Sequence, residues 1–137
     1  MLKLLIHADA GADLQAIKAA GDLRSFGVVL AFLQQAKADQ KILESLSTDF
    51  HGVDGVGNFD IRKWVSQQKQ GRNLWRVKLC DIKGMGVPHR ILYAFNPASL
   101  TYFVLAIMER GIDYDESHTR IRRLMAVYDS LRIARDQ

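Results

Sequence analysis

The first quarter of the chain places its apolar residues in one short run and then at helical spacing. Leu2–Ala8 is short and apolar, which predicts a strand. Asp9 or Asp13 is expected to cap the short helix that follows, and Gly21 is expected to end it. Asp22 is expected to cap a second, longer helix. The apolar positions of this helix recur every three or four residues: Phe26, Val29, Leu30 and Leu33.

Two more helical segments and a glycine-rich loop are predicted in the middle of the chain. Gln40–Ser47 has the spacing of one or two helical turns, and Phe59–Lys69 is predicted to be a helix with Trp64 facing inward. Residues 50–58 between them include three glycines, which indicates a loop. No Lys-Ser or Lys-Thr pair accompanies these glycines, so a phosphate-cradling loop is not expected there.

The second half of the chain alternates apolar and polar positions, which predicts three consecutive strands and then a helix. The strands cover Leu74–Ile82, His89–Phe95 and Thr101–Glu109. Alternate apolar side chains are expected to face the preceding helices: Trp75, Val77 and Leu79, then Ile91, Tyr93 and Phe95, then Phe103, Leu105 and Ile107. A C-terminal helix is predicted near His118–Ala134. Its apolar stripe is Ile121, Leu124, Met125, Tyr128 and Leu131.

The opposite face of the same strands is expected to carry Arg76, Lys78, Arg90 and, after Val104, Ala106 and Met108, Arg110. Consecutive hairpins make these strands antiparallel neighbours, so the basic groups converge on one surface. The pattern predicts one α+β domain over residues 1–137. Its antiparallel sheet would have the N-terminal helices on one face and a charged surface on the other, followed by the C-terminal helix.

The net charge of +4 originates in one segment. Arg62–Arg90 contains eight basic residues and a single acid, Asp81, which gives +7, whereas residues 1–61 sum to −3 and residues 91–137 to zero. A concentrated positive charge needs an anionic partner, and nucleic acid is the first candidate. Local pairs are expected at the start of the C-terminal helix, between Asp113, Asp115 and Glu116 and the arginines Arg120, Arg122 and Arg123.

Composition limits the chemistry that the chain can perform. Its single cysteine, Cys80, excludes an internal disulfide and fits a cytoplasmic location. Four dispersed histidines have no metal-ligand spacing, so neither a metal nor another cofactor is expected. No apolar run approaches the roughly 18–20 residues of a membrane span, so no membrane partner is expected.

Three stretches resemble the RelE/ParE family of bacterial toxins from type II toxin–antitoxin pairs. They are Leu74–Leu79 (LWRVKL), His89–Phe95 (HRILYAF) and Val104–Arg110 (VLAIMER), with Tyr114 after the last. Family members commonly show a basic strand, an Arg-hydrophobic-hydrophobic-Tyr strand, and an apolar strand that ends in a basic residue near a tyrosine. The order of a strand, helices, three strands and a helix also matches.

The resemblance implies a RelE-like (microbial ribonuclease-like) fold and a toxin that a cognate antitoxin neutralises. RelE-type members cut mRNA on the ribosome without metal, so translation inhibition is expected, with the ribosome and mRNA as partners. Cleavage by 2′-hydroxyl attack needs a base, cations that stabilise the phosphorane, and an acid. Catalytic candidates are Lys78, Arg90, Arg110 and Tyr114, with Lys78 as base. RNA-binding candidates are Arg76, Lys78, Arg90 and Arg110. His89 and His118 are the other acid–base groups expected nearby.

Two features keep a non-catalytic function open. Asp113 and Asp115 flank Tyr114 and would repel RNA phosphates, and the additional C-terminal helix could cover the site. ParE-type members inhibit DNA gyrase and cut nothing. The alternative is therefore a gyrase inhibitor or an inactive nucleic-acid-binding module, and the oligomeric state is left open.

Overall fold

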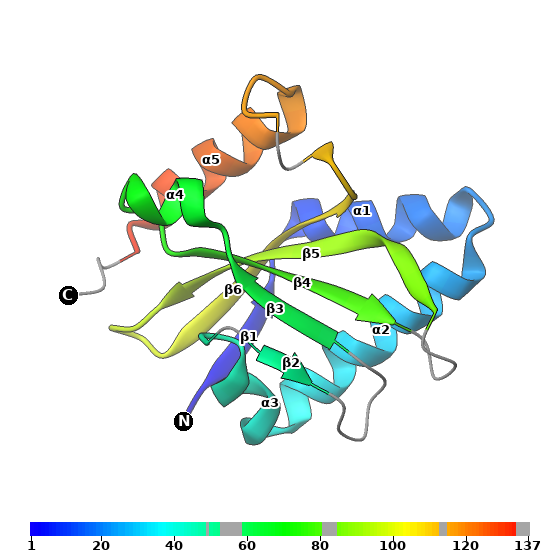
Figure 1. The fold of residues 1–137 in the computed structure, drawn as a ribbon, viewed down its shortest axis with the longest axis horizontal. Helices are drawn as coiled ribbons and strands as arrows, with labels where there is room; N and C mark the ends of the chain where they lie inside the picture. The colour runs from blue at the N-terminus through cyan, green and yellow to red at the C-terminus, as the bar shows by residue number, and fades with distance from the viewer. Residues whose placement is uncertain (49, 53–58, 81–84, 113–114, 134–137) are drawn as a thin grey trace.

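The computed structural model describes residues 1–48, 50–52, 59–80, 85–112 and 115–133. Within these ranges, six strands form one central sheet with helices on both faces (Figure 1). The elements in chain order are β1 (Lys3–Ile6), α1 (Ala8–Ala19), α2 (Leu23–Ala38), α3 (Gln40–Ser45), β2 (Phe50–Gly52), β3 (Phe59–Lys63), α4 (Val65–Lys69), β4 (Leu74–Cys80), β5 (Gly86–Asn96), β6 (Thr101–Glu109) and α5 (Thr119–Leu131).

The strand order across the sheet is β1-β6-β5-β4-β3-β2. Strands β2 to β6 run antiparallel to their neighbours, whereas β1 lies parallel to β6. The α+β class is therefore confirmed, but the prediction of an antiparallel sheet is wrong at this edge. The chain leaves β1 through helices rather than through a hairpin turn, so no turn forces β1 to run antiparallel to its neighbour.

The helices α1, α2 and α3 cover one face of the sheet and enclose the larger core, as predicted. Leu33 and Leu43 pack there against strand residues such as Ile61, and all three are at most 1% exposed. Removing such a side chain costs about 2–5 kcal/mol of stability, so this face anchors the fold. The inward side chains predicted for β4 and β5 lie in the same core: Trp75, Val77, Leu79, Ile91 and Tyr93.

The helix α5 covers part of the other face, with α4 beside it (Figure 1). Ile121 and Leu124 of α5 pack in a second core with Leu92, Leu105 and Met108 of the sheet. The predicted apolar stripe of the C-terminal helix is thus confirmed. The expectation of a charged face across all three strands is wrong, because this helix buries the portion over β6 and the second half of β5.

Residues 59–69 form a strand and a short helix, and not the single helix predicted. Phe59 and Ile61 alternate with Asp60 and Arg62, so β3 sends its two apolar side chains into the larger core. Trp64 then breaks the strand, and its backbone N–H donates to the carbonyl of Leu74 (3.0 Å). The prediction that Trp64 faces inward is confirmed, since it lies in the second core.

A β-bulge in β6 overturns the alternation predicted for this strand. Leu92 pairs with Ala106 while the next residue, Tyr93, pairs with Val104, so Leu105 is an extra residue without its own partner. The bulge turns Leu105 and Ala106 to the same side of the sheet, the side that α5 covers. The bulge adds one residue to β6, and a prediction that assumes strict alternation does not allow for an extra residue.

The termini of the first elements are fixed by side-chain hydrogen bonds. His7 caps α1, because its Nδ1 accepts from the N–H of Asp9 (3.0 Å), so neither predicted aspartate is the cap. Asp22 caps α2 as predicted, accepting from the N–H of Ser25 (3.0 Å). At the outer edge of β1, Gln40 bonds both backbone groups of Leu2, accepting from its N–H (3.0 Å) and donating to its carbonyl (2.9 Å).

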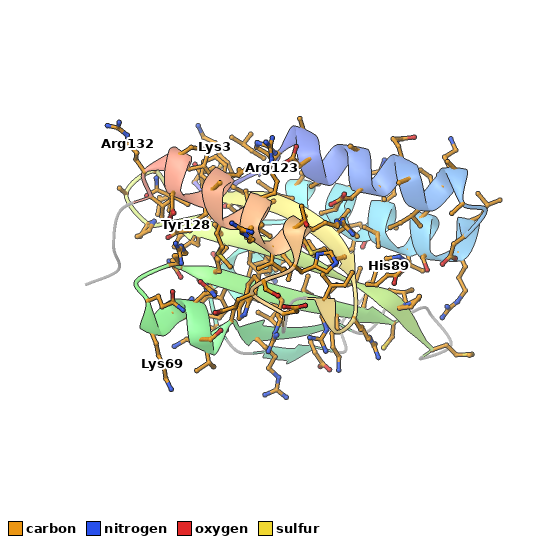
Figure 2. All side chains as sticks on the ribbon, turned by 90° about the horizontal axis from the view of Figure 1, so that it is seen from above. Lys3, Lys69, His89, Arg123, Tyr128 and Arg132 are labelled. Atoms are coloured by element: carbon orange, nitrogen blue, oxygen red, sulfur yellow. The ribbon has the colours of Figure 1, made fainter. Side chains whose placement is uncertain are left out.

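The arginines of α5 bond to α1, which contradicts the local pairs predicted for Arg120 and Arg123. The Arg120 guanidinium is 2.8 Å from the Asp13 carboxylate, and that of Arg123 is 2.9 Å from the Asp9 carboxylate. Figure 2 shows Arg123 where α5 approaches the beginning of α1. The two helices that cover opposite faces of the sheet are therefore joined by two ion pairs around its edge.

Candidate nucleic-acid interface

Three neighbouring strands, β3, β4 and β5, turn charged side chains to the face that α5 leaves open. In the sheet register, Asp60 lies opposite Lys78, and Lys78 lies opposite Arg90. In the next row along the strands, Arg62 lies opposite Arg76. Side chains in one row are about 4.8 Å apart at the backbone, and the two rows are about 7 Å apart. The charges therefore form a compact patch on the rigid floor of a sheet.

This patch is concave and encloses a volume of about 400 Å³, which we call the basic pocket. Its described lining consists of Asp60, Arg62, Lys63, Val65, Arg76, Lys78 and Arg90. The register turns four of these cations to the open face, Arg62, Arg76, Lys78 and Arg90, together with the Asp60 carboxylate. The Lys63 ammonium instead lies 5.8 Å from the centre of the Trp75 ring, which belongs to the larger core on the other face. The side chains of Arg76, Lys78 and Arg90 are half-buried, while Arg62 is exposed.

The boundary of the basic pocket follows from the cross-strand rows. The row that begins with Asp60, Lys78 and Arg90 continues into Met108 on β6. The parallel row passes from Arg62 and Arg76 to apolar residues, Leu92 and then Ala106. Both rows change from charged to apolar where α5 packs on the sheet, because Leu92, Ala106 and Met108 belong to the second core. The basic surface therefore ends where α5 packs on the sheet, and the described lining of the pocket contains no residue of this helix.

The electrostatics of the basic pocket favour an anionic ligand. Two like charges about 7 Å apart repel by roughly 2 kcal/mol when the effective dielectric constant is about 20. Half-buried charges are also screened less by salt than exposed ones. The cations at Arg76, Lys78 and Arg90 outnumber the one carboxylate in the described lining, Asp60, so an anion that binds among them relieves this repulsion. A guanidinium group contacts two oxygens of a phosphate or a carboxylate at once, so both anions suit the two arginines.

The residues predicted for the site are only partly brought together. Arg76, Lys78 and Arg90 line the basic pocket. Arg110 does not appear in its described lining. The Arg110 guanidinium lies against the backbone of Gly86, with Nη2 2.9 Å from where a Cβ at that glycine would be. Tyr114 and the acids Asp81 and Asp113 lie outside the residues that the structure describes.

Neither histidine expected near the site lines the basic pocket. His118 caps α5, with its Nδ1 accepting from the N–H of Arg120 (3.1 Å). His89 lies on the face of the sheet that α1, α2 and α3 cover, in a hollow that it shares with Ile17 of α1 and with Glu109. Cross-strand pairing also places His89 opposite Glu109. Both imidazoles therefore have positions set by local structure, away from the basic pocket.

Prediction from the sequence missed the contribution of β3 to the site. Arg62 and Lys63 were expected on a helix, and Asp60 was not considered as a site residue. The available signal was the alternation of Phe59 and Ile61 with charged residues, which is a strand pattern of only five positions. A pattern this short is compatible with one helical face as well.

No helix in the described part of the chain has the length and apolar character needed to cross a membrane. Among the described residues, no group of three or more His, Cys, Asp or Glu side chains is arranged to hold a metal ion. Comparison with known protein families, with curated proteins and with solved structures found no match to this chain.

Proposed function

We propose that the protein is an RNA-binding toxin of the RelE/ParE type, which inhibits translation by engaging mRNA on the ribosome through the basic pocket. The observation that carries the proposal is the convergence of four cations from β3, β4 and β5 on one concave surface: Arg62, Arg76, Lys78 and Arg90. The sequence resemblance lies on β4, β5 and β6, so it shares two strands with the basic pocket. An antitoxin, the ribosome and mRNA are the proposed partners, and the cytoplasm is the proposed location.

Cleavage of the bound RNA is the stronger form of this proposal. Guanidinium groups of Arg76 and Arg90 would hold the scissile phosphate and stabilise the charge that develops on it. Lys78 is the base candidate, because it lies opposite Arg90 and two residues along β4 from Arg76. Arg110 and Tyr114 would have to contribute from the end of β6 and from the segment after it.

Binding without cleavage is the second candidate, and one specific observation favours it. The described residues that line the basic pocket supply cations and one carboxylate, and neither a histidine nor a tyrosine. Such a lining binds phosphate well but offers few groups that exchange protons near neutral pH. The candidate includes a ParE-like gyrase inhibitor and an inactive nucleic-acid-binding module on this fold.

Induced expression with and without the Arg90→Ala substitution tests the proposal. The parent protein is expected to arrest growth and to yield transcripts cut only in the presence of ribosomes, and Arg90→Ala is expected to relieve both effects. Arg122→Ala is the matched control, because Arg122 is exposed on α5 and outside the basic pocket. Growth arrest with intact transcripts and stalled DNA replication would support the gyrase candidate. An Arg90→Ala variant as toxic as the parent would overturn the assignment of the pocket.

A further inference from the structure

Asp60 is the one acidic residue in the described lining of the basic pocket. A carboxylate on the floor of an anion-binding site repels the ligand that the surrounding cations attract. Asp60 is half-buried in β3, opposite Lys78 in the same row as Arg90. Asp60 is therefore the first member of the charged row and the direct neighbour of Lys78, so a ligand that contacts Lys78 lies beside Asp60.

The chemistry of a carboxylate restricts what Asp60 can contact in a bound nucleic acid. An ionised carboxylate accepts hydrogen bonds and donates none, so its target is a donor group on the ligand. Strand spacing places Asp60 about 5 Å from Lys78 and about 7 Å from the row of Arg62 and Arg76, measured at the backbone. Asp60 is therefore within the length of one nucleotide of a phosphate held by these cations.

The donor nearest to a phosphate in RNA is the ribose 2′-hydroxyl. It is on C2′, the carbon next to C3′, which bears the 3′-phosphate. This hydroxyl is also the group by which proteins distinguish RNA from DNA. An acidic side chain that accepts from a ribose hydroxyl beside a bound phosphate is a known arrangement in nucleotide-binding sites. DNA lacks the donor, so in DNA the same carboxylate would contribute only repulsion.

We propose that Asp60 accepts a hydrogen bond from a ribose 2′-hydroxyl and thereby makes the basic pocket prefer RNA to DNA. The inference rests on the proposed function, because it presumes that the basic pocket binds a nucleic-acid strand. It goes beyond that function by assigning discrimination between the two nucleic acids to one side chain.

Binding of three single-stranded probes with the same base order tests the proposal: RNA, DNA and 2′-fluoro RNA. Fluorine keeps the RNA-like sugar shape but cannot donate a hydrogen bond. The wild-type protein is expected to bind RNA about tenfold more tightly than either other probe, as one hydrogen bond to a charged group allows. In Asp60→Ala, binding to DNA is expected to strengthen, and the RNA-to-DNA ratio is expected to fall close to one.

Two control variants separate hydrogen bonding from charge. Asp60→Asn removes the charge but keeps an acceptor oxygen, so it is expected to retain a preference for RNA while binding both probes more tightly. Glu44→Ala removes an exposed acid on α3, against the opposite face of the sheet, and is expected to leave the ratio unchanged. Thermal unfolding of each variant verifies that it is folded.

The outcomes distinguish this inference from the proposed function. If Asp60→Ala strengthens RNA and DNA binding equally and leaves their ratio as in the wild type, the carboxylate acts through charge alone and the inference is overturned. If the wild-type protein binds RNA and 2′-fluoro RNA equally, the hydroxyl contact is likewise excluded. If the wild-type protein binds no RNA, the proposed function fails, and this inference fails with it.

Discussion

Asp13 of α1 and Arg120 of α5 bond to each other and to the backbone of the same β6 residue, Ile107. Their side chains are 2.8 Å apart, from Arg120 Nη2 to Asp13 Oδ1. Asp13 also accepts from the N–H of Ile107 (3.0 Å), and Arg120 donates to the carbonyl of Ile107 (3.1 Å). Since β1 pairs with β6 only up to Val104, these two side chains satisfy the backbone of β6 beyond the end of β1.

Asp13→Ala is expected to lower the free energy of unfolding by about 2 kcal/mol, because the buried N–H of Ile107 loses its acceptor and the guanidinium of Arg120 loses one of its two partners. Chemical denaturation measures this loss. Asp9→Ala is the matched control, since the Asp9–Arg123 pair is more exposed and its loss is expected to cost less stability than the loss of Asp13. Equal losses in the two variants would contradict the role assigned to Asp13.

The Asp9–Arg123 pair is expected to stabilise the fold at neutral pH and to lose this effect as the solution becomes acidic. The hydrogen bond from Arg123 lowers the pKa of Asp9 below its ordinary value of 3.8 in the folded protein. The unfolded state therefore binds more protons in this range, so the stabilisation is complete above about pH 4 and is lost as the pH falls through the folded pKa. Unfolding of the wild type and of Arg123→Gln, measured from neutral to acidic pH, checks this. A stability difference that stays constant down to about pH 2 would refute the linkage.

Tyr128→Phe is expected to destabilise the protein by about 1–2 kcal/mol, since it deprives one buried donor of its acceptor. The Tyr128 hydroxyl accepts from the backbone N–H of Asn73 (2.8 Å), and Asn73 is 6% exposed. The Asn73 side chain in turn accepts from Trp75 Nε1 (2.8 Å), so this bond links α5 to the beginning of β4. Urea denaturation of the variant measures the effect. A variant as stable as the wild type would show that water replaces the hydroxyl.

Arg90→Ala is expected to weaken RNA binding about tenfold and to reduce the salt dependence of binding by the equivalent of one phosphate contact. Arg110→Ala is expected to change both quantities much less, because the Arg110 guanidinium lies against Gly86 and outside the described lining of the basic pocket. Titration of RNA at several salt concentrations measures both quantities. Equal effects of the two substitutions would place Arg110 in the RNA site.

Periodicity predicted most of the elements, and its failures share a physical cause. The helices α2 and α5 and the strands β4 and β5 have enough repeats to define one buried face. β3 has only five residues, so its apolar positions were compatible with a helix. The bulge at Leu105 adds one residue to β6, which reverses the face of every position on one side of it.

The candidate site was predicted where it depends on strand alternation and missed where it depends on long-range contacts. Arg76, Lys78 and Arg90 follow directly from the pattern of β4 and β5. Alternation along β6 places Arg110 on the same face as Arg90. Its side chain nevertheless lies against Gly86 of β5, which no local sequence pattern indicates. The coverage of β6 by α5 is likewise a tertiary property, because the apolar stripe of a helix does not specify which face of the sheet it packs on.

The hydrogen bonds between Gln40 and Leu2 have a consequence for self-association. Lys3 directs its N–H to Leu100 at the beginning of β6, so the backbone groups of Leu2 point to the opposite, outer edge. A foreign strand that added to this edge would need those same groups, and the Gln40 amide already occupies both of them. The Gln40 side chain thus blocks the first pairing position at this edge of the sheet. This is expected to disfavour edge-to-edge aggregation, in which exposed strands of two molecules pair.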